Sequence, residues 1–220
     1  MKSPVNFGIY SVINPEFLLS IDEHLKIKSN LNPELLIKSR PLICVYANTK
    51  YGERPYFVPL TKINPNDKTF KRRDVKWNEF AEWEKNKEIK TFHIMKSPTN
   101  NTPGFKSVAL LYQAFPMPYY GIRIKPFIRH KEIMTIPEET AALLKDLTQK
   151  YLEATQTSRK RPFVPLKGHL KSVYYAQDNK EYSHYPVNHC LLLDIMKAKE
   201  NQIKKAKDAA KQKKEEEKEK

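Results

Sequence analysis

Two apolar, strand-like runs in close succession constrain the fold of this chain more than any other feature of its sequence. They span residues 41–46 and 56–60, and a polar stretch, residues 48–53, lies between them. A connection of this length between two strand-like runs is typical of an antiparallel hairpin. The N-terminal half is therefore predicted to contain a β-hairpin in its most apolar part.

Further runs along the chain predict an α+β fold. Strand-like runs are expected at residues 7–12, 89–95, 107–115 and 120–128. Helices are expected from residue 14 to about 25, over 75–85, from Pro137, and from Asn188 into the C-terminal run. Caps, first-turn prolines and first-turn acids mark these starts, as in Asn14-Pro15-Glu16 and in Glu138-Glu139 after Pro137.

Charge points to a polyanionic partner. Lys and Arg number 40 against 25 Asp and Glu, which gives a net charge of +15. From Lys197 onward there are ten lysines and six acids, so the C-terminal run contributes +4 and the rest of the chain +11. A balance of this kind favours nucleic acid as the partner class, and a generically basic protein is the alternative.

Length and composition fit a single domain, residues 1–200, followed by a charged tail, residues 201–220. Apolar residues make up 40% of the chain and aromatic residues 11%, so the domain is able to bury a sizeable core. The tail has helix-forming composition but almost no apolar stripe, so we expect it to fray beyond about residue 205. A solvated tail is favoured over an electrostatic arm for RNA.

Cysteine usage and hydropathy predict a cytoplasmic protein. Cys44 and Cys190 lie far apart, and the first residues lack the basic-then-apolar pattern of a signal peptide. No apolar run approaches the roughly 20 residues that a membrane helix needs. A membrane is therefore not among the expected partners.

Several enzyme classes find no support in the residues. Carboxylates are not clustered as a divalent-metal nuclease would need, and His184, His189 and Cys190 lack a second ligand pair for zinc. With only five glycines, the chain has neither a nucleophile elbow nor a phosphate-binding glycine loop. No metal and no cofactor is predicted.

Cleavage of RNA requires no nucleophile from the enzyme, because the 2'-hydroxyl of the RNA itself is the nucleophile. The protein need only align that hydroxyl, move protons and offset charge on the phosphorane. Residues 61–76 concentrate suitable groups and are interpreted as a basic loop, for which a solvated, phosphate-binding turn is the alternative. The candidate catalytic residues are Thr61, Lys62, Lys68 and Lys71.

Aromatic and basic residues nearby are candidates for RNA contact. Aromatic rings provide stacking faces for unpaired bases, although tyrosines of a small domain more often pack in the core. A histidine whose ordinary pKa is near neutrality can move protons, although a strand histidine is more often a packing residue. The rings considered for stacking are Tyr10, Tyr46, Tyr51, Tyr56, Trp77, Tyr112, Tyr119 and Tyr120. The residues predicted to contact RNA are Tyr10, Arg40, Tyr56, Arg72, Arg73, Lys76, Trp77, His93, Tyr112 and Gln113.

The order of segments resembles the ToxN/AbiQ family, the ribonuclease toxins of type III toxin-antitoxin systems. The collinear match spans about residues 5–200. Its segments are FGIY at 7–10, FLL at 17–19 with Asp22, RPLICV at 40–45, YFVPLT at 56–61, SVALLYQAFPMP at 107–118, and residues 190–200. The YFVPLT run is similar to the family's strand that ends in a Pro-Leu-Thr-Ser or Pro-Leu-Ser-Ser active-site turn.

The resemblance implies a fold and an activity. The expected fold is a strongly bent antiparallel β-sheet or barrel core of the MazF/Kid kind, decorated with helices and extended by the charged helical tail. The expected activity is metal-independent cleavage of RNA to a 2',3'-cyclic phosphate, in toxin-antitoxin function or phage abortive infection. The implied partners are mRNA as substrate and a small repeat antitoxin RNA, which closes with the toxin into a ring.

The resemblance also implies site residues. Thr61 matches the hydroxyl residue of the family's active-site turn, and Lys62 stands where the family usually has serine. Lys68 and Lys71 are both options for the family's lysine, and Gln113 stands where the family usually has asparagine. The resulting mechanistic hypothesis is that Thr61 and Lys62 hold the scissile phosphate and that Lys68 or Lys71 offsets charge in the transition state. Two alternatives stay open: a non-catalytic RNA-binding protein that uses the same groove, and a MazF/PemK-type toxin with a protein antitoxin.

Overall fold

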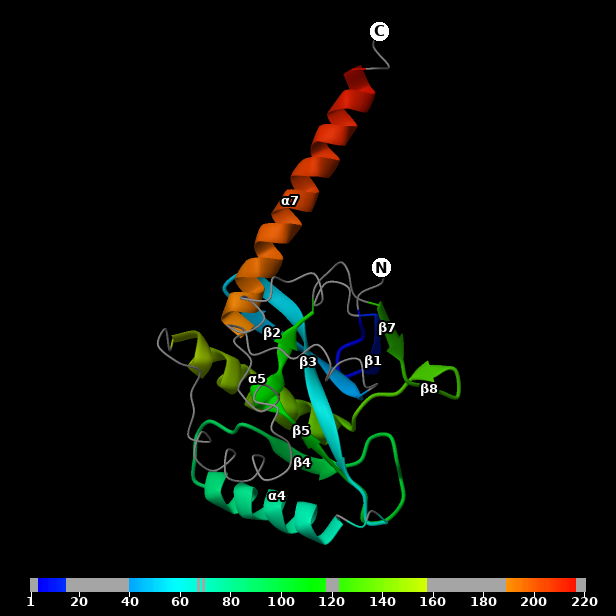
Figure 1. Ribbon diagram of the computed structural model, residues 1–220, viewed down its shortest axis with the longest axis vertical. Helices are drawn as coiled ribbons and strands as arrows, with labels where there is room; N and C mark the ends of the chain where they lie inside the picture. The colour runs from blue at the N-terminus through cyan, green and yellow to red at the C-terminus, as the bar shows by residue number, and fades with distance from the viewer. Residues whose placement is uncertain are drawn as a thin grey trace.

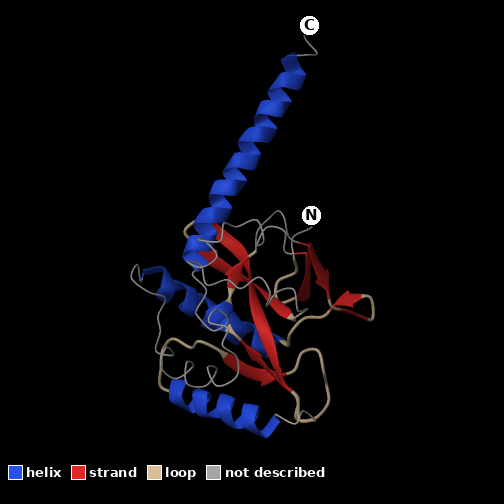
Figure 2. Ribbon diagram, viewed as in Figure 1, coloured by secondary structure: helices blue, strands red, loops and turns tan. Residues whose placement is uncertain are grey.

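The computed structural model describes residues 4–14, 40–66, 68, 70–117, 123–157 and 189–216. Within these ranges the chain folds as a mixed α+β structure with a mostly antiparallel sheet and three helices (Figures 1 and 2). The predicted α+β class is confirmed. The helix predicted from residue 14 to about 25 and the region 158–188 lie outside the described residues.

The predicted hairpin forms the centre of the sheet. Strand β2 (Leu42–Thr49) pairs with β3 (Gly52–Ile63) from Leu42↔Pro59 to Thr49↔Gly52. Only Lys50 and Tyr51 lie between the strands, so the turn is shorter than the six polar residues suggested. Gly52 has φ +93°, a conformation that L side chains rarely adopt, which explains glycine at this end of the turn.

The remaining strands extend the sheet on both sides of the hairpin, in the order β4-β5-β3-β2-β1-β7, with β6 also paired to β3. Strands β8 and β9 form a separate two-stranded ribbon. The bounds are β1 (Ile9–Asn14), β4 (His93–Lys96), β5 (Lys106–Ala109), β6 (Phe115–Pro116), β7 (Arg123–Pro126), β8 (Ile128–Arg129) and β9 (Glu132–Ile133).

The sheet stays open, and the closed barrel is not found among the described strands. The outermost strands, β4 and β7, lie at opposite ends of the order and do not pair. Strand β3 divides its pairing: residues 52–59 pair with β2, whereas residues 60–63 pair with β5 on the other side. The sheet therefore continues past the end of β2 along β3 instead of returning to close on itself.

Both faces of the hairpin are buried, which explains its continuous apolar sequence. Ile43 and Val45 belong to the core that includes α5 (Glu138–Thr157), while Leu42 and Cys44 belong to a second core on the other face. The second core is covered by the start of α7 (His189–Glu216). Alternate residues of β2 thus point to different helices, as the pleat of a strand requires.

Helix α5 begins as predicted, directly after Pro137, with two acids in its first turn. Its core face consists of Ala141, Leu144, Thr148, Tyr151, Leu152 and Thr155, whose spacing of three or four residues forms one helical stripe. The apolar residues of this helix predict a core face of Leu143, Leu144, Leu147, Tyr151 and Leu152, but Leu143 is 45% exposed, because it lies beside the stripe rather than on it.

The basic loop predicted over residues 61–76 is corrected by the structure. Thr61 to Ile63 complete β3, and helix α4 spans Phe70–Glu84, so only residues 64–69 connect the two elements. The helix was expected to start at 75. It starts earlier because Trp77 and Phe80 pack against Phe92, with Trp77 and Phe92 ring centroids 4.9 Å apart, and this anchor supports a helix whose first turns are basic.

Two predicted strands are shorter than expected. The run at 107–115 is interrupted after Ala109 by a 3-10 turn, η1 (Leu111–Gln113), before β6, and the run at 120–128 is divided between β7 and β8 in its described part. Among the described residues, no helix combines the length and apolar character that crossing a bilayer requires.

Helix α7 projects from the body of the molecule (Figure 1). Leu192, Leu193 and Met196 are fully buried, and the guanidinium of buried Arg54 pairs with Glu200. Beyond this point the described side chains are exposed, apart from half-buried Ile203, yet the helix continues to Glu216. The tail is therefore helical in the structure, and its fraying in solution stays a prediction.

Candidate functional site

The register of β3 separates the two residues expected to hold one phosphate. Thr61 is opposite Val108 and Lys62 is opposite Ser107, in an uninterrupted ladder with β5. Because successive side chains of a strand point to opposite faces, Thr61 and Lys62 point away from each other. The expectation that both grip the same phosphate is therefore wrong for this geometry, and the reason is that the strand continues through them.

Helix α4 covers the face of the sheet on which the side chain of Thr61 lies. Val108 and Ile94 lie in the same row as Thr61, and Phe92, which packs on Trp77 of α4, precedes this row by two residues. On this face Lys106 forms an ion pair with Asp74 of α4, with 2.8 Å between the charged atoms. Thr61 is half-buried beside the helix.

The opposite face of the same strands carries Lys62 and His93. His93 is opposite Ala109, which is in turn opposite Leu60. Lys62 is two residues after Leu60, in the next row on the same face, where it is opposite Ser107. The β5 residue in the row of His93 is therefore Ala109, and the β5 residue in the row of Lys62 is Ser107, so both rows carry a small side chain on the strand between β3 and β4. Lys62 is exposed, and His93 is half-buried, so that burial lowers the pKa of its ring.

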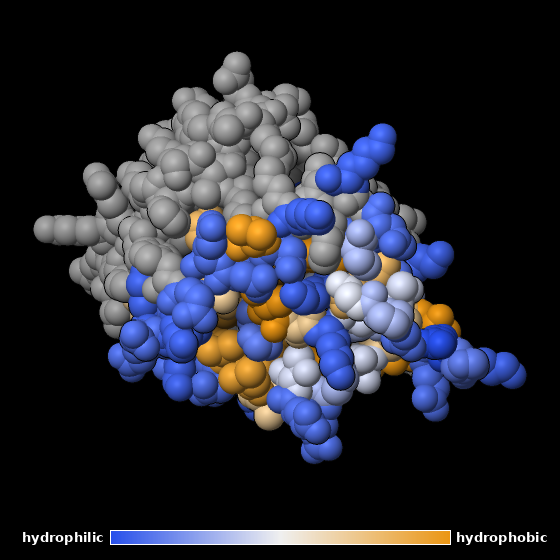
Figure 3. All heavy atoms as spheres, turned by 90° about the horizontal axis from the view of Figure 1, so that it is seen from below, coloured by the Kyte–Doolittle hydropathy of each residue, from blue (hydrophilic) through white to orange (hydrophobic). Residues whose placement is uncertain are grey.

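The other predicted cations are distributed around the start of α4. Lys68 is exposed in the connection before the helix, and Lys71 is exposed in its first turn. Arg72, Arg73 and Lys76 lie on the same helix, and their side chains fall outside the described residues. Viewed from below, the side on which α4 lies, the surface combines hydrophilic side chains with a band of apolar ones (Figure 3).

Four of the predicted stacking rings are core residues, whereas Tyr46 is half-buried, Tyr51 is exposed, and Tyr119 and Tyr120 lie outside the described residues. Tyr56 is 0% exposed, and Tyr10, Tyr112 and Trp77 are 4% exposed or less. The Tyr10 hydroxyl accepts a hydrogen bond of 2.7 Å from the Val5 amide. A ring without an exposed face offers no surface to an unpaired base, so the proposed role of these four rings in stacking is corrected to packing.

Two further predicted contacts differ in accessibility. Gln113 is 7% exposed in η1, so a direct contact with RNA is not available to it in this structure. Arg40 is half-buried in the segment that leads into β2, where some of its surface remains accessible. Both residues lie in segments that carry the family resemblance, and a resemblance between sequences does not show how deeply a side chain is buried.

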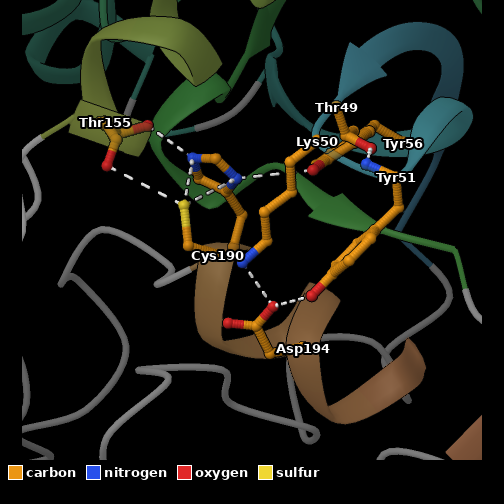
Figure 4. Close-up of polar contacts among 8 residues, drawn as sticks. Thr49, Lys50, Tyr51, Tyr56, Thr155, Cys190 and Asp194 are labelled. Carbon is orange, nitrogen blue, oxygen red and sulfur yellow. Dashed lines mark hydrogen bonds and ion pairs between the residues drawn. The ribbon is translucent and has the colours of Figure 1, made fainter. Parts of the chain in front are cut away.

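A buried polar junction joins α5, β3 and α7 (Figure 4). The Thr155 hydroxyl lies 2.5 Å from Nε2 of His189, and the Tyr56 hydroxyl lies 3.4 Å from Nδ1. The Thr155 hydroxyl also lies 2.8 Å from the Tyr151 carbonyl, to which it donates as a helix side chain commonly does. We infer that His189 carries its proton on Nε2 and accepts from Tyr56 at Nδ1.

Burial fixes the protonation of this junction. It lowers the pKa of His189 to about 4, so the ring is neutral at pH 7. Cys190 lies beside it, with its sulfur 3.9 Å from each ring nitrogen, and burial raises the pKa of this thiol. A protonated thiol beside a sealed, neutral imidazole is suited to structural support rather than to nucleophilic attack.

The exposed rim of the junction is charged. Asp194, one turn into α7, accepts from Lys50 and from the Tyr51 hydroxyl, each over 2.6 Å, and both donors belong to the hairpin turn (Figure 4). Lys50 and Tyr51 are 144 and 143 residues from Asp194 in the chain. Tyr51 is among the rings that the sequence suggested for stacking, but no sequence signal links it or Lys50 to Asp194.

A buried carboxyl elsewhere in the structure was also missed. Glu84, at the end of α4, is 2% exposed and accepts hydrogen bonds from the amide and hydroxyl of Thr91. Burial raises the pKa of this carboxyl, and it also raises the pKa of Tyr151 nearby. The contacts fasten the end of α4 to the segment before β4, a structural role.

The predicted site residues are thus only partly brought together. Lys62 and His93 share a face, Thr61 lies on the other, and Lys68 and Lys71 are near the start of α4. Among the described residues, no three His, Cys, Asp or Glu side chains converge as a metal-binding group. No protein-family model matches the chain, and no curated protein matches it either.

Proposed function

We propose that this chain is an endoribonuclease toxin that cleaves RNA without a metal ion, by attack of the 2'-hydroxyl to leave a 2',3'-cyclic phosphate. The resemblance to the ToxN/AbiQ family and the charge of +11 outside the C-terminal run support the proposal. The same resemblance supports a bent sheet of the MazF/Kid kind, a cytoplasmic location, and inhibition by a structured repeat RNA in a toxin-antitoxin or abortive-infection system.

One observation carries the catalytic proposal: exposed Lys62 shares a sheet face with His93, across the small residues Ser107 and Ala109. RNA transesterification needs a base for the 2'-hydroxyl proton, a group that offsets charge on the phosphorane, and a proton for the departing 5'-oxygen, and an imidazole and an ammonium group are able to supply these functions. The lowered pKa of His93 keeps its ring neutral at pH 7, so it can accept the 2'-hydroxyl proton. Lys62 then offsets the negative charge that develops on the phosphorane, and its ammonium group donates a proton to the 5'-oxygen as the bond between that oxygen and phosphorus breaks.

This arrangement assigns different roles to the two neighbours on β3. Lys62 contacts the phosphate, whereas Thr61, on the face of α4, has no contact with the same group. Lys68 and Lys71, near the start of α4, are placed to bind phosphates further along the RNA. Binding of this kind is electrostatic and weakens as salt rises.

Cleavage of a labelled transcript in the presence of chelator tests the proposal. Lys62→Ala should lower the cleavage rate by about 100-fold or more, as loss of a group that stabilises transition-state charge does. Lys96→Ala is the matched control, because Lys96 is an exposed lysine of β4 whose row, with Lys106 and Ile63, lies on the opposite face. Intact transcripts with the unmodified chain, or cleavage only with added magnesium or zinc, would overturn it.

An assay of growth inhibition distinguishes the role of Lys62 from that of Thr61. If Lys62→Ala abolishes toxicity and Thr61→Ala retains it, the register argument is supported. If both variants remain fully toxic, the site lies elsewhere in the chain. His93→Ala should reduce cleavage as well, while His93→Lys should not restore it, because a lysine is protonated at neutral pH and cannot accept the proton.

A non-catalytic RNA-binding protein is the second candidate, and the divergence of Thr61 and Lys62 favours it. Such a protein would bind the transcript and leave it whole in the same digest. A MazF/PemK-type toxin is a third reading. The neighbouring DNA distinguishes it, because an RNA antitoxin is encoded as short tandem repeats and a protein antitoxin as an open reading frame.

A further inference from the structure

Tyr51 differs from the other candidate aromatic residues in its position. It is 40% exposed at the tip of the β2–β3 hairpin, and it is the one aromatic among the large hydrophobic side chains that the structure describes as exposed. Tyr10, Tyr56, Tyr112 and Trp77 are buried. An exposed ring at the end of a rigid hairpin is available to a ligand without any rearrangement of the core.

The ring is held in a fixed orientation. Its hydroxyl donates to Oδ1 of Asp194 over 2.6 Å, which ties the side chain to α7. Its amide donates to the Thr49 hydroxyl over 3.1 Å, and that hydroxyl donates to the Gly52 carbonyl over 2.7 Å, which closes the turn. A ring anchored at both ends loses little conformational entropy when a ligand stacks on it.

Two ammonium groups lie over the ring of Tyr51. The Lys50 Nζ lies 5.0 Å from the ring centroid, and the Lys197 Nζ lies 5.9 Å from it. One comes from the hairpin and the other from α7, and Asp194 is the acid that holds the turn against the helix (Figure 4). An aromatic face with adjacent cations is the combination that single-stranded nucleic acid binds through its bases and phosphates.

We infer that Tyr51 is a stacking platform for an unpaired base of single-stranded RNA, and that Lys50 and Lys197 hold the phosphates next to that base. The choice of RNA rests on the proposed function. The platform is not part of the catalytic face, because it lies at the opposite end of β3 from Lys62: Tyr51 precedes Gly52, the first residue of that strand, and Lys62 is its penultimate residue.

Binding of a fluorescently labelled 2'-O-methyl oligonucleotide tests the inference. This probe lacks the 2'-hydroxyl nucleophile, so it stays whole even if the protein is a ribonuclease. Tyr51→Leu keeps apolar bulk and removes the aromatic face. This substitution should raise the dissociation constant by roughly 5- to 150-fold. Tyr51→Phe keeps the ring and should bind within about threefold of the unmodified chain, which separates stacking from the hydrogen bond to Asp194.

Two further measurements make the result specific. Tyr51→Trp should show quenching of its added fluorescence when the probe binds, because the indole would stack on a base. Lys50→Ala and Lys197→Ala should each reduce the slope of the logarithm of affinity against the logarithm of salt by somewhat less than one, the value expected for one phosphate contact on a single strand. Thermal melts of each variant check that the fold is retained.

The outcomes distinguish this inference from the proposed function. Tyr51-dependent binding without any cleavage of RNA would support the platform and overturn the nuclease. Cleavage that depends on Lys62, together with unchanged probe affinity in Tyr51→Leu, would overturn the platform alone. Failure of the unmodified chain to bind any oligonucleotide would overturn both.

Discussion

The two parts of α7 have similar helix-forming composition but opposite environments. From His189 to Met196 the helix buries three apolar side chains and a histidine in the body of the molecule. From residue 201 onward the described side chains are exposed, apart from half-buried Ile203. The comparison teaches that backbone propensity extends this helix, whereas tertiary packing decides which part of it contributes to stability and to the site.

The boundary between the two parts is where α7 meets the hairpin. Asp194 and Lys197 contact the turn residues Lys50 and Tyr51, and Glu200 pairs with Arg54 of β3. These contacts orient the exposed rim without filling the core. Changes to the packed part should therefore unfold the protein, changes at the rim should affect binding, and changes to the outer part should have little effect.

The largest effect is expected from a cavity in the packed part. Leu192 is 0% exposed in the second core, so Leu192→Ala should lower the free energy of unfolding by about 2–5 kcal/mol. Urea denaturation followed by circular dichroism measures this. Lys204→Ala, on the outer part, is the control and should stay within about 0.5 kcal/mol of the unmodified protein. Equal effects of the two substitutions would refute the division of the helix.

A pH-dependent effect of intermediate size is expected from His189. Its folded pKa is about 4, below the ordinary value of 6.5, so the unfolded chain binds a proton more readily. The free energy of unfolding should therefore fall as the pH is lowered from about 6.5 to about 4, by on the order of 3 kcal/mol in total, and this contribution is constant above that window.

Comparison of the unmodified chain with His189→Gln isolates the contribution of His189 to the pH dependence of the free energy of unfolding. Glutamine keeps a donor and an acceptor in the junction but does not titrate, so the difference in stability between the two proteins should diminish towards pH 4. Denaturant titrations at a series of pH values give this difference directly. A difference that does not vary with pH would contradict a neutral, buried ring.

The smallest effect is expected from removal of the outer part. Deletion of all residues after Lys205 should shift the thermal midpoint by only a few degrees and leave the fold intact, because the deleted residues that the structure describes bury no apolar side chain. Differential scanning calorimetry measures the midpoint. A loss comparable to that of Leu192→Ala would mean that the outer part packs on the domain in solution.

Prediction from sequence succeeded where signals are local and failed where they are not. The hairpin of β2 and β3 was predicted because two apolar runs flank a turn, and α5 was predicted because Pro137 and two acids precede an apolar stripe. The segment 61–76 was misread as a loop. Lys62 and the basic start of α4 have a polar composition, and neither the pairing with β5 nor the anchor of Trp77 on Phe92 is visible in neighbouring residues.

The candidate site shows the same division. The cations around β3 and α4 were identified by residue type, but the separation of Thr61 from Lys62 follows from strand register, and the burial of Tyr10 and Tyr56 follows from packing. The rim of Lys50, Tyr51 and Asp194 unites segments more than 140 residues apart. Nothing in the sequence near any one of them indicates the others.

The sequence by itself determined the α+β class, the central hairpin, the start of α5 and the excess of positive charge, because each depends on residues within a few positions or on composition. Only the tertiary structure decided which face each side chain occupies, which rings are covered, and which charges meet. Those properties depend on contacts between distant segments, and a contact of that kind leaves no trace in the local order of residues.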